Sequence, residues 1–570
     1  MLRRLLEWLV ANGTEGVGLP DSKLALYRGR HGERGILCQW DFLPGEVLAR
    51  VPLRLALADH PGDEESNALV YEGAPWSVRL ACRLLRERAR GAASPWRRYL
   101  DSLPAAVPSP LEALAWEDLR AVDYPPMQAA LDRLAWLAGD AWQRLSPEAT
   151  GGASREAFGW ALSVVHSRTF GTPAADGAGV GVRMLVPLVD MLNHAGDQTR
   201  LRPRDPAAAQ DHVEWRACAP GSPGNASGEW EMHVVALRPC EAGEEVLMSY
   251  GERANDDFFL HYGFVPDGNP HDAADLFAGT GELLDYAAAL GGEGARGRAE
   301  AAVRAVEGEV SGAGEGHLLG GGGGGPGPGG DASDDPFAPG LKVLAGCRVD
   351  RRVTGALAAA LGAGGPEAAE RAVADRCLEV LGAFEGSLLG DLERLAQTPR
   401  ESAGDAAFGE SAEEVESDPE GAWRRGRWRA MLAHYHAAIG RFLEAGGRTP
   451  AEAAAASPLG PPRGAGAEGA AGGAGAAGPV MLEDPALMAE GLGIDLGALG
   501  VAPPAGGEGA GGAPPPADGA AAWDDAGAWS EEAQRHRDTA TAYLAWKKAL
   551  LWDFVIAAYE PPAPGAGASE

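Results

Sequence analysis

Hydrophobic positions recur with two different periods along the chain, and the change divides it into a strand-rich first half and a helical second half. Strand-like alternation, with turns at glycines, is found at residues 24–52, 182–190, 229–237 and 243–251. Helical spacing is found at residues 2–9, 67–100 and 111–145. This order predicts a β-rich unit that is split by a helical insertion.

Beyond about residue 290 the helical pieces alternate with segments of biased composition. The helical pieces are residues 366–397, 422–445 and 533–559. The biased segments are residues 320–330, 401–421, 463–478 and 503–521, rich in glycine, alanine, proline or acidic residues. Such segments cannot bury enough apolar surface to offset the conformational entropy of ordering them. We therefore predict one all-helical C-terminal domain with disordered insertions.

The predicted fold class is α+β, and it has four consecutive parts. They are residues 1–60, the N-terminal helix and the first part of the β-rich unit; 61–160, the helical insertion; 161–275, the second part of the β-rich unit; and 276–560, the helical domain.

Composition narrows the class of partner. The chain of 570 residues contains 82 glycines and 42 prolines, so the packed protein is smaller than the chain. It carries 81 acidic against 49 basic residues, a formal net charge of −32. This charge argues against binding to the phosphate backbone of nucleic acid or to an anionic membrane surface. A basic segment of a protein is the more natural ligand.

The cysteines and the N-terminus bear on the compartment. Six cysteines are scattered without a CxxC or CxC pair, so we expect neither a metal site nor a disulfide framework, and a reducing intracellular compartment fits best. No run of eighteen apolar residues is present. The opening MLRRLLEWLV predicts an amphipathic helix, and no transit peptide is visible.

The segment VPLVDMLNHAG, residues 186–196, ends an apolar run in Asp190, Asn193 and His194. A buried strand or core helix does not tolerate three polar side chains without partners. Asn193 and His194 are compatible with a simple turn after a core strand. Taken in isolation, the segment favours this turn over a binding site at the end of the strand.

Three segments resemble, in order, the signature blocks of SET-domain protein methyltransferases. They are HGERGILCQWDFLPGEVLARVP (31–52), LVPLVDMLNHAG (185–196) and CEAGEEVLMSYGERANDDFFLHYGFVPDGNP (240–270). The resemblance is greatest to the branch typified by the Rubisco large-subunit lysine methyltransferase. It covers residues 1–290, and residues 375–395 resemble the substrate-binding domain of that branch. The implied fold is a split SET domain followed by a helical substrate-binding domain, and the implied cofactor is S-adenosyl-L-methionine.

The resemblance assigns cofactor contacts to the first two segments and to Arg168 in HSRTF (166–170), which resembles the Ser-Arg-x-Phe element of the family. The implied cofactor-binding residues are Glu33, Arg34, Gly35, Ile36, Arg168, Asn193 and His194. Gly35 lets the main chain approach the cofactor, and the Arg168 guanidinium suits its carboxylate. Asn193 holds the methionine or adenine end, and the His194 main chain meets the adenine. The His194 side chain locks a crossing of two segments.

The catalytic residues implied by the family are Tyr262 and Tyr250. A phenol with a pKa near 10 is a poor base at neutral pH, so Tyr262 is expected to orient the amine and stabilise the transition state, while Tyr250 forms the pore wall. Asn255 is expected to cap the helix that presents Tyr262. The implied substrate-binding residues are Ser167, through its carbonyl oxygen, Phe170, Val189 and Asp190, which faces the lysine channel or braces the strand end.

The sequence thus predicts a protein-lysine N-methyltransferase that acts as a monomer on a protein with an accessible lysine. Histidine-directed relatives place a polar residue where Phe170 stands and a tryptophan where Val189 stands, so a protein-histidine methyltransferase is the enzymatic alternative. A non-catalytic binding module on a SET fold and a structural α+β protein are the others. The resemblance implies a plastid as one location, with the cytoplasm or nucleus otherwise.

Overall fold

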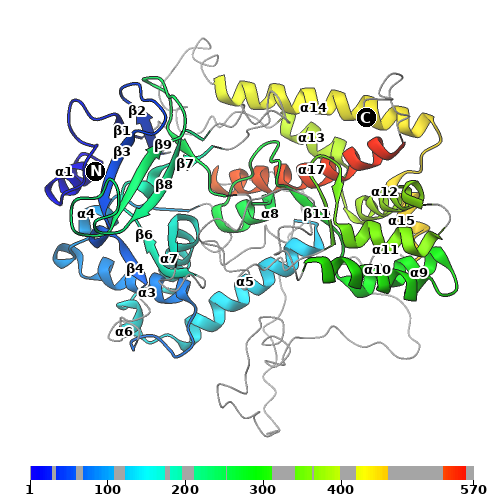
Figure 1. Ribbon diagram of the computed structural model, residues 1–570, viewed down its shortest axis with the longest axis horizontal. Coiled ribbons are helices and arrows are strands. Elements are labelled where there is room, and N and C mark those ends of the chain that lie inside the picture. The colour runs from blue at the N-terminus through cyan, green and yellow to red at the C-terminus, as the bar shows by residue number, and fades with distance from the viewer. Residues whose placement is uncertain are drawn as a thin grey trace, which may run out of the picture.

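Two hydrophobic cores organise the protein in the computed structural model (Figure 1). The structure describes residues 2–28, 34–59, 68–107, 109, 122–173, 180–195, 211–251, 253–310, 341–362, 365–397, 419–459 and 531–559. One core gathers buried side chains between Leu5 and Met248. The other gathers buried side chains between Val122 and Val555. The described residues confirm the α+β class.

The first core lies under three small sheets and helix α1 (Leu2–Ala11). Strands β1 (Leu24–Arg28) and β2 (Arg34–Cys38) pair antiparallel. A five-stranded sheet has the order β3 (Val47–Pro52), β9 (Glu231–Ala236), β8 (Val213–Cys218), β10 (Leu247–Met248) and β7 (Asn193–His194). A three-stranded sheet has the order β4 (Leu57–Asp59), β6 (Val180–Leu185) and β5 (Thr169–Pro173). Strands from before and after the helical insertion therefore share sheets.

The helical insertion covers the first core and reaches the second. Its helices are α3 (Trp76–Ala89), α4 (Arg97–Leu100), α5 (Pro125–Arg144), α6 (Pro147–Thr150) and α7 (Arg155–Arg168). Met127 and Leu131, near the start of α5, are buried in the second core, whereas Ala138 and Ala141, near its end, are buried in the first. Figure 1 shows α5 running between the two halves. One helix thus fixes the two cores relative to each other.

The second core is mostly helical, as the spacing predicts. Its helices are α9 (Thr280–Gly291), α10 (Ala295–Val310), α11 (Arg351–Leu361), α12 (Gly365–Ala383), α13 (Leu388–Gln397), α14 (Pro419–Glu444), α15 (Pro450–Ala455) and α17 (Glu531–Tyr559). The expectation of an all-helical domain needs one correction. A three-stranded sheet, β11 (Ala273–Phe277), β12 (Leu341–Leu344) and β13 (Arg348–Val349), lies beside these helices. These strands are short, and residues far apart in the sequence pair to form them, so the local pattern carried little signal.

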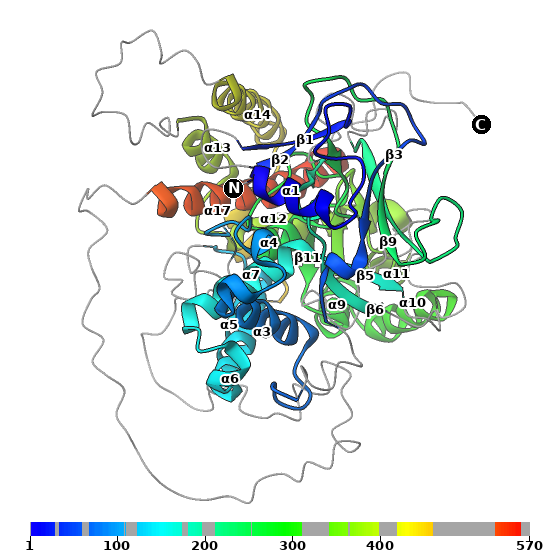
Figure 2. The ribbon, with the colours of Figure 1, turned by 90° about the vertical axis from the view of Figure 1, so that its left-hand side faces the viewer.

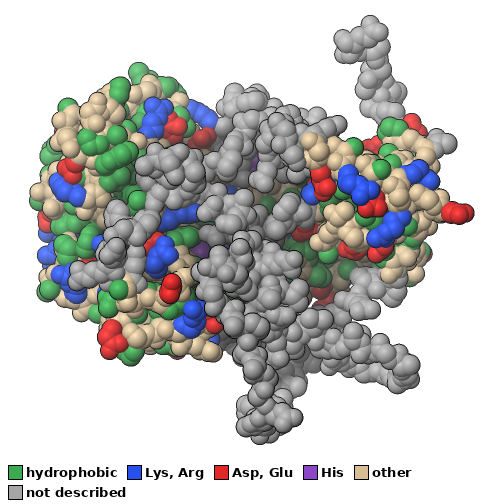
Figure 3. All heavy atoms as spheres, turned by 60° about the horizontal axis from the view of Figure 1, so that its bottom comes forward, with side chains coloured by type: hydrophobic (Ala, Val, Ile, Leu, Met, Phe, Trp, Pro, Cys, Tyr) green, Lys and Arg blue, Asp and Glu red, His purple; other side chains and the backbone are tan. Residues whose placement is uncertain are grey.

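The segments of biased composition lie outside the described residues, apart from residues 419–421 at the start of α14. Within the described residues, no helix is long and apolar enough to cross a membrane. Figure 3 shows acidic and basic side chains interspersed on the described surface of the helical half, without one continuous acidic patch on that face.

Candidate active site

Strands β7 and β10 bring the second and third sequence blocks together. They pair in parallel, with Asn193 opposite Leu247 and His194 opposite Met248. The chain enters β7 through a single helical turn, η4 (Val189–Met191). Leu188 before this turn has a φ of 76°, a left-handed conformation that leucine rarely adopts, so packing must enforce the reversal. The reversal places the polar end of the apolar run against the third block.

A hydrogen-bonded cluster joins β2 to these two strands. The Asn193 side-chain amide donates to the Arg34 carbonyl oxygen, at 2.9 Å, and to Glu245 Oε1, at 2.8 Å. The Tyr27 hydroxyl donates to the same Glu245 oxygen, at 2.9 Å. Gly35 lies inside this cluster. The three sequence blocks therefore meet, as the resemblance implies, and Glu245 is the anion that holds them.

Gly35 has no room for a side chain, which leads to a first prediction. A Cβ at this position would lie 2.4 Å from Glu245 Oε1, 2.6 Å from Tyr27 Cε1 and 3.0 Å from Asn193 Nδ2. We expect Gly35→Ala to lower the free energy of unfolding by about 1–3 kcal/mol, because the neighbours must shift. Chemical denaturation measures this change. The control is Gly139→Ala in α5, where a Cβ meets nothing within 4 Å, and unchanged stability in Gly35→Ala would refute the close approach.

Two arginines and one carboxylate lie next to this cluster. Arg168, the last residue of α7, donates from Nη1 to the Asp190 carbonyl oxygen at 2.5 Å, and its Nη1 lies 3.7 Å from Asp190 Oδ2. The Tyr99 hydroxyl donates to Asp190 Oδ2 at 2.9 Å. Burial, then the neighbouring Arg168, lowers the pKa of Arg34 to about 10. Burial raises the pKa of Asp190, against the opposing effect of Arg168. Asp190 is thus held by Tyr99 and Arg168 just before β7, and its role at the lysine channel or the strand end stays a prediction.

Two buried polar atoms in this group lack partners among the described residues. They are Arg168 Nε and Asp190 Oδ1. A buried guanidinium nitrogen that is aimed at no protein acceptor is costly unless something else satisfies it. Two guanidinium groups surround one carboxylate here, so the excess positive charge favours binding of one more anionic group.

Aromatic rings surround the two predicted catalytic tyrosines. The ring centroids of Tyr250 and Tyr262 are 5.1 Å apart, and the His194 ring lies 5.1 Å from Tyr250 and 4.6 Å from Phe258. The Tyr250 hydroxyl donates to the Leu192 carbonyl oxygen at 2.9 Å. Among the described residues, the Tyr262 hydroxyl has no hydrogen-bond partner, and burial raises its pKa. Tyr262 is therefore a phenol whose oxygen is available to a ligand.

The His194 side chain joins two segments of the chain. Its Nδ1 accepts the backbone N–H of Tyr250 at 3.2 Å, which ties β7 to the residues after β10. A ring nitrogen can accept only when it is unprotonated. Burial lowers the pKa of His194 to about 4, so the ring is neutral at physiological pH.

This depressed pKa predicts a pH dependence of stability. In the unfolded chain His194 takes up a proton near pH 6.5, whereas in the folded protein it stays unprotonated until about pH 4. The contribution of His194 to the free energy of unfolding is fully present above pH 6.5. It is lost progressively as the pH falls to 4, by up to about 3 kcal/mol. We expect His194→Asn, whose amide oxygen also accepts, to show a shallower fall in unfolding free energy across that window. Identical pH profiles would contradict the assignment.

The remaining predicted residues are placed as follows. Ile36 is fully buried, and its carbonyl oxygen accepts from the Val246 N–H at 2.7 Å. Val189 and Phe170 are buried in the first core, and the Phe170 ring packs edge-on against Trp215. The Ser167 hydroxyl donates to the Ser163 carbonyl oxygen at 2.7 Å in the last turn of α7. Glu33 lies outside the described residues.

The expected cap at Asn255 is wrong in detail. Tyr262 ends a helical segment made of α8 (Asn255–Asp257) and the π-helical turn η6 (Phe258–Tyr262). Asn255 is the first residue of α8, and its side-chain oxygen accepts from Asn269 at 2.9 Å. The Asn255 backbone N–H instead donates to Asp272 Oδ1 at 3.1 Å. A carboxylate from outside the helix does the capping, so the local sequence pointed to the wrong side chain.

Sequence reasoning missed three residues of the site: Tyr27, Tyr99 and Glu245. Glu245 stood in the third block, in GEEVLMSYG, where nothing separates it from the solvent-facing Glu244. Alternation along the predicted strand 243–251 is the one signal in the sequence that could have distinguished Glu245 from Glu244. Tyr99 lies in the helical insertion, far in sequence from Asp190, and carries no motif.

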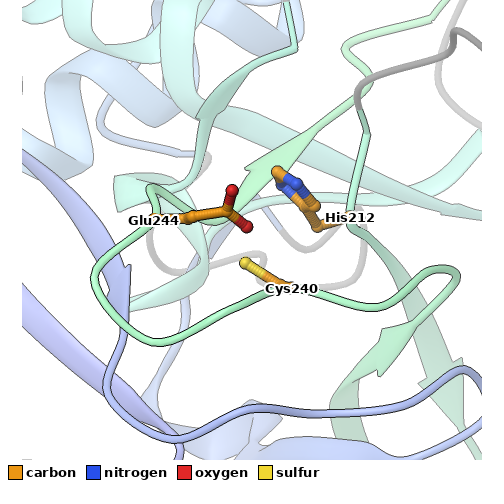
Figure 4. A group of neighbouring side chains, drawn as sticks. All are labelled: His212, Cys240 and Glu244. Atoms are coloured by element: carbon orange, nitrogen blue, oxygen red, sulfur yellow. The ribbon is translucent and has the colours of Figure 1, made fainter.

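A second group of neighbouring side chains consists of His212, Cys240 and Glu244 (Figure 4). Their potential ligand atoms lie within 4.8 Å of one another. However, His212 Nδ1 accepts the Leu247 N–H at 3.2 Å, which places the proton of the neutral ring on Nε2. Neither ring nitrogen then has a free lone pair for a metal, and we assign no metal to this group.

Known proteins with related sequences include methyltransferases. The ribosomal lysine N-methyltransferase set10 of Schizosaccharomyces pombe is 23% identical over 244 residues, 42% of this chain and 41% of that protein. The actin-histidine N-methyltransferase of Danio rerio is 30% identical over 223 residues, 36% of this chain and 33% of that protein. The chain resembles SET-domain protein methyltransferases.

Comparison with solved structures gives related matches. A solved SET domain of LSMT, bound to lysine and AdoHcy, covers 68% of this chain and 82% of its own, with 17% identity and a TM-score of 0.42. No protein-family model matches the chain. The matched region spans less than half the length of the two curated SET-domain relatives, and one of these is named for lysine, the other for histidine.

Proposed function

We propose that the chain is a protein-lysine N-methyltransferase that transfers a methyl group from S-adenosylmethionine to a lysine side chain of a protein substrate. One observation carries the proposal. Three segments that are far apart in the sequence meet at one place: β2 with Arg34 and Gly35, the end of the apolar run with Asn193, and the helical segment that ends at Tyr262. The relatives named above supply the reaction class.

The residues present fit S-adenosylmethionine. When bound, it supplies a methyl group on a positively charged sulfur. Arg34 and Arg168 would hold its carboxylate, because they share a single protein carboxylate, Asp190, and Arg168 Nε is buried without a partner among the described residues. The side-chain NH₂ group of Asn193 already donates hydrogen bonds to the Arg34 carbonyl oxygen and to Glu245, so its position is set before a ligand binds. The first two blocks thus form a preorganised binding surface.

The two tyrosines have different tasks in this proposal. The Tyr250 hydroxyl donates a hydrogen bond to the Leu192 carbonyl oxygen, which leaves the lone pairs of its own oxygen free to accept. The Tyr262 oxygen is free of described protein partners, so it orients the attacking amine by a hydrogen bond. Burial raises the pKa of both phenols, which keeps them protonated, so neither serves as a general base. Water carries away the proton of the amine.

Lysine is favoured over histidine by the residues at two positions. The resemblance gives histidine-directed relatives a polar residue in place of Phe170 and a tryptophan in place of Val189. Here Phe170 is apolar and packs against Trp215, and Val189 is fully buried, so a larger ring at position 189 would overpack the core. An apolar wall suits the long aliphatic stem of lysine. Protein-histidine methylation is the second candidate, because the Danio rerio relative is named for it.

Calorimetric titration with S-adenosylmethionine, followed by incubation with a labelled methyl donor and a cell extract, tests the proposal. We expect binding to the purified chain and label on a protein of the extract. A chain that binds the cofactor without labelling any protein would point to the binding module. A chain that does not bind the cofactor would refute the enzyme.

A further inference from the structure

Lysine is rare in this chain, and two lysines are buried side by side in α17. The chain has four lysines against 45 arginines. Lys547 and Lys548 are 0% and 2% exposed. A buried ammonium group without partners costs several kcal/mol, so each must be paired. Arginine is the cation at nearly all other positions. We infer that these two positions require the smaller ammonium group, whose charge is concentrated at one nitrogen.

Lys547 reaches the helical segment that ends at Tyr262. Its Nζ donates to Asp256 Oδ2 at 3.1 Å, to Asp272 Oδ1 at 2.6 Å and to the Ala273 carbonyl oxygen. Both carboxylates are buried. The Tyr543 hydroxyl, one turn earlier on α17, also donates to Asp256. A single ammonium group therefore bridges two buried anions that come from separate segments.

These two anions fix the start of the segment 255–262. Asp256 is the second residue of α8, and Asp272 caps α8 by accepting the Asn255 N–H. In addition, the Phe259 ring of η6 stacks on Tyr543, with centroids 4.9 Å apart. Figure 1 shows α17 passing beside α8, and Figure 2 shows the same helix from the side. Helix α17 thus contacts and holds the helical segment from which Tyr262 projects.

Lys548 provides a matched comparison. It lies on the same helix and is equally buried, but its Nζ donates to Asp391 of α13, at 2.6 Å. Asp391 belongs to the helical core, and neither it nor Lys548 contacts the segment 255–262 through a described hydrogen bond or ion pair. The two lysines share burial and charge, and they differ in what they hold.

We propose that Lys547 is a positioning residue for Tyr262. Through Asp256 and Asp272, it fixes the segment that carries the Tyr262 phenol relative to α17. A displacement of about 1 Å in a reacting group lowers a rate about a hundredfold. The effect on catalysis rests on the proposed function, whereas the structural link from Lys547 to the segment 255–262 does not.

The experiment compares Lys547→Met with Lys548→Met in the full chain. Hydrogen exchange with mass spectrometry reports the backbone amides of residues 255–263, and steady-state kinetics reports kcat beside the Kd for S-adenosylmethionine. We expect both variants to lose stability, but only Lys547→Met to lose protection at 255–263. In Lys547→Met, kcat should fall about tenfold or more while the cofactor Kd stays constant, since the cofactor residues lie on other strands. If Lys547→Met does not fold, Tyr543→Phe, which removes the hydroxyl that donates to Asp256, should show the same pattern more weakly.

Two results would overturn the positioning role. They are unchanged protection at 255–263 in Lys547→Met, and equal loss of protection there in both lysine variants. Selective loss of protection in Lys547→Met, together with a wild-type chain that transfers no methyl group, would refute the proposed function and uphold the structural link.

Discussion

Tyr262→Phe is expected to lower kcat about a hundredfold or more while leaving the Kd for S-adenosylmethionine unchanged. The phenol oxygen lacks a protein partner among the described residues, so its removal costs the fold little. It deprives the attacking amine of the hydrogen bond that orients it, an interaction made at the reacting centre. Single-turnover kinetics with labelled cofactor separates the chemical step from binding.

A matched control for this variant is Tyr435→Phe. The Tyr435 hydroxyl donates to Asp553 at 2.8 Å inside the helical core, away from the site. We expect this control to lose some stability and to keep kcat. Equal rates for wild type and Tyr262→Phe would remove Tyr262 from the catalytic role and leave Tyr250 as the remaining hydroxyl.

Arg168→Lys is expected to weaken binding of S-adenosylmethionine by about tenfold or more. A lysine retains the charge but loses the planar fork, and with it the Nε that is buried without a described partner. Hydrogen bonds to a charged group contribute about 1.5–3 kcal/mol, which corresponds to this range. Isothermal titration calorimetry measures the change in Kd.

Arg79→Lys is the control, because it alters a comparable pair in the same half of the protein. Arg79 donates to both oxygens of buried Asp59, at 3.0 and 2.6 Å, and its side chain is 27% exposed against 22% for Arg168. We expect similar losses of stability in the two variants and a change in cofactor Kd in Arg168→Lys alone. Equal Kd values for both variants and the wild type would place the cofactor carboxylate elsewhere.

The sequence was informative where chemistry and pattern coincide along the chain. Alternation predicted several strands of the first core, and helical spacing predicted α12, α13, α14 and α17 of the second, because burial of one face imposes those periods. The polar end of the run 186–196 predicted a site, because Asn193 and His194 needed partners in an apolar setting. The structure supplies these partners in Glu245, the Arg34 carbonyl and the Tyr250 N–H.

Long-range pairs were beyond the reach of the sequence. Asp272 caps α8 in place of Asn255, and Lys547 bonds Asp256 across 291 residues. Such contacts are set by how the cores pack, and a surface carboxylate and a buried one look alike in a single sequence. The small sheet of β11, β12 and β13 was missed for the same reason, since each strand is shorter than the window over which a period can be recognised.

Mass spectrometry of a cell extract that has been incubated with the chain and S-adenosylmethionine tests the central claim most directly. Peptides from reactions with wild type and with Tyr262→Phe are compared for the residue that carries the added methyl group. The account predicts methyl-lysine in the wild-type reaction and little or none in the variant reaction. Methyl-histidine in the wild-type reaction would contradict the lysine assignment, and equal methylation by the two proteins would contradict the site.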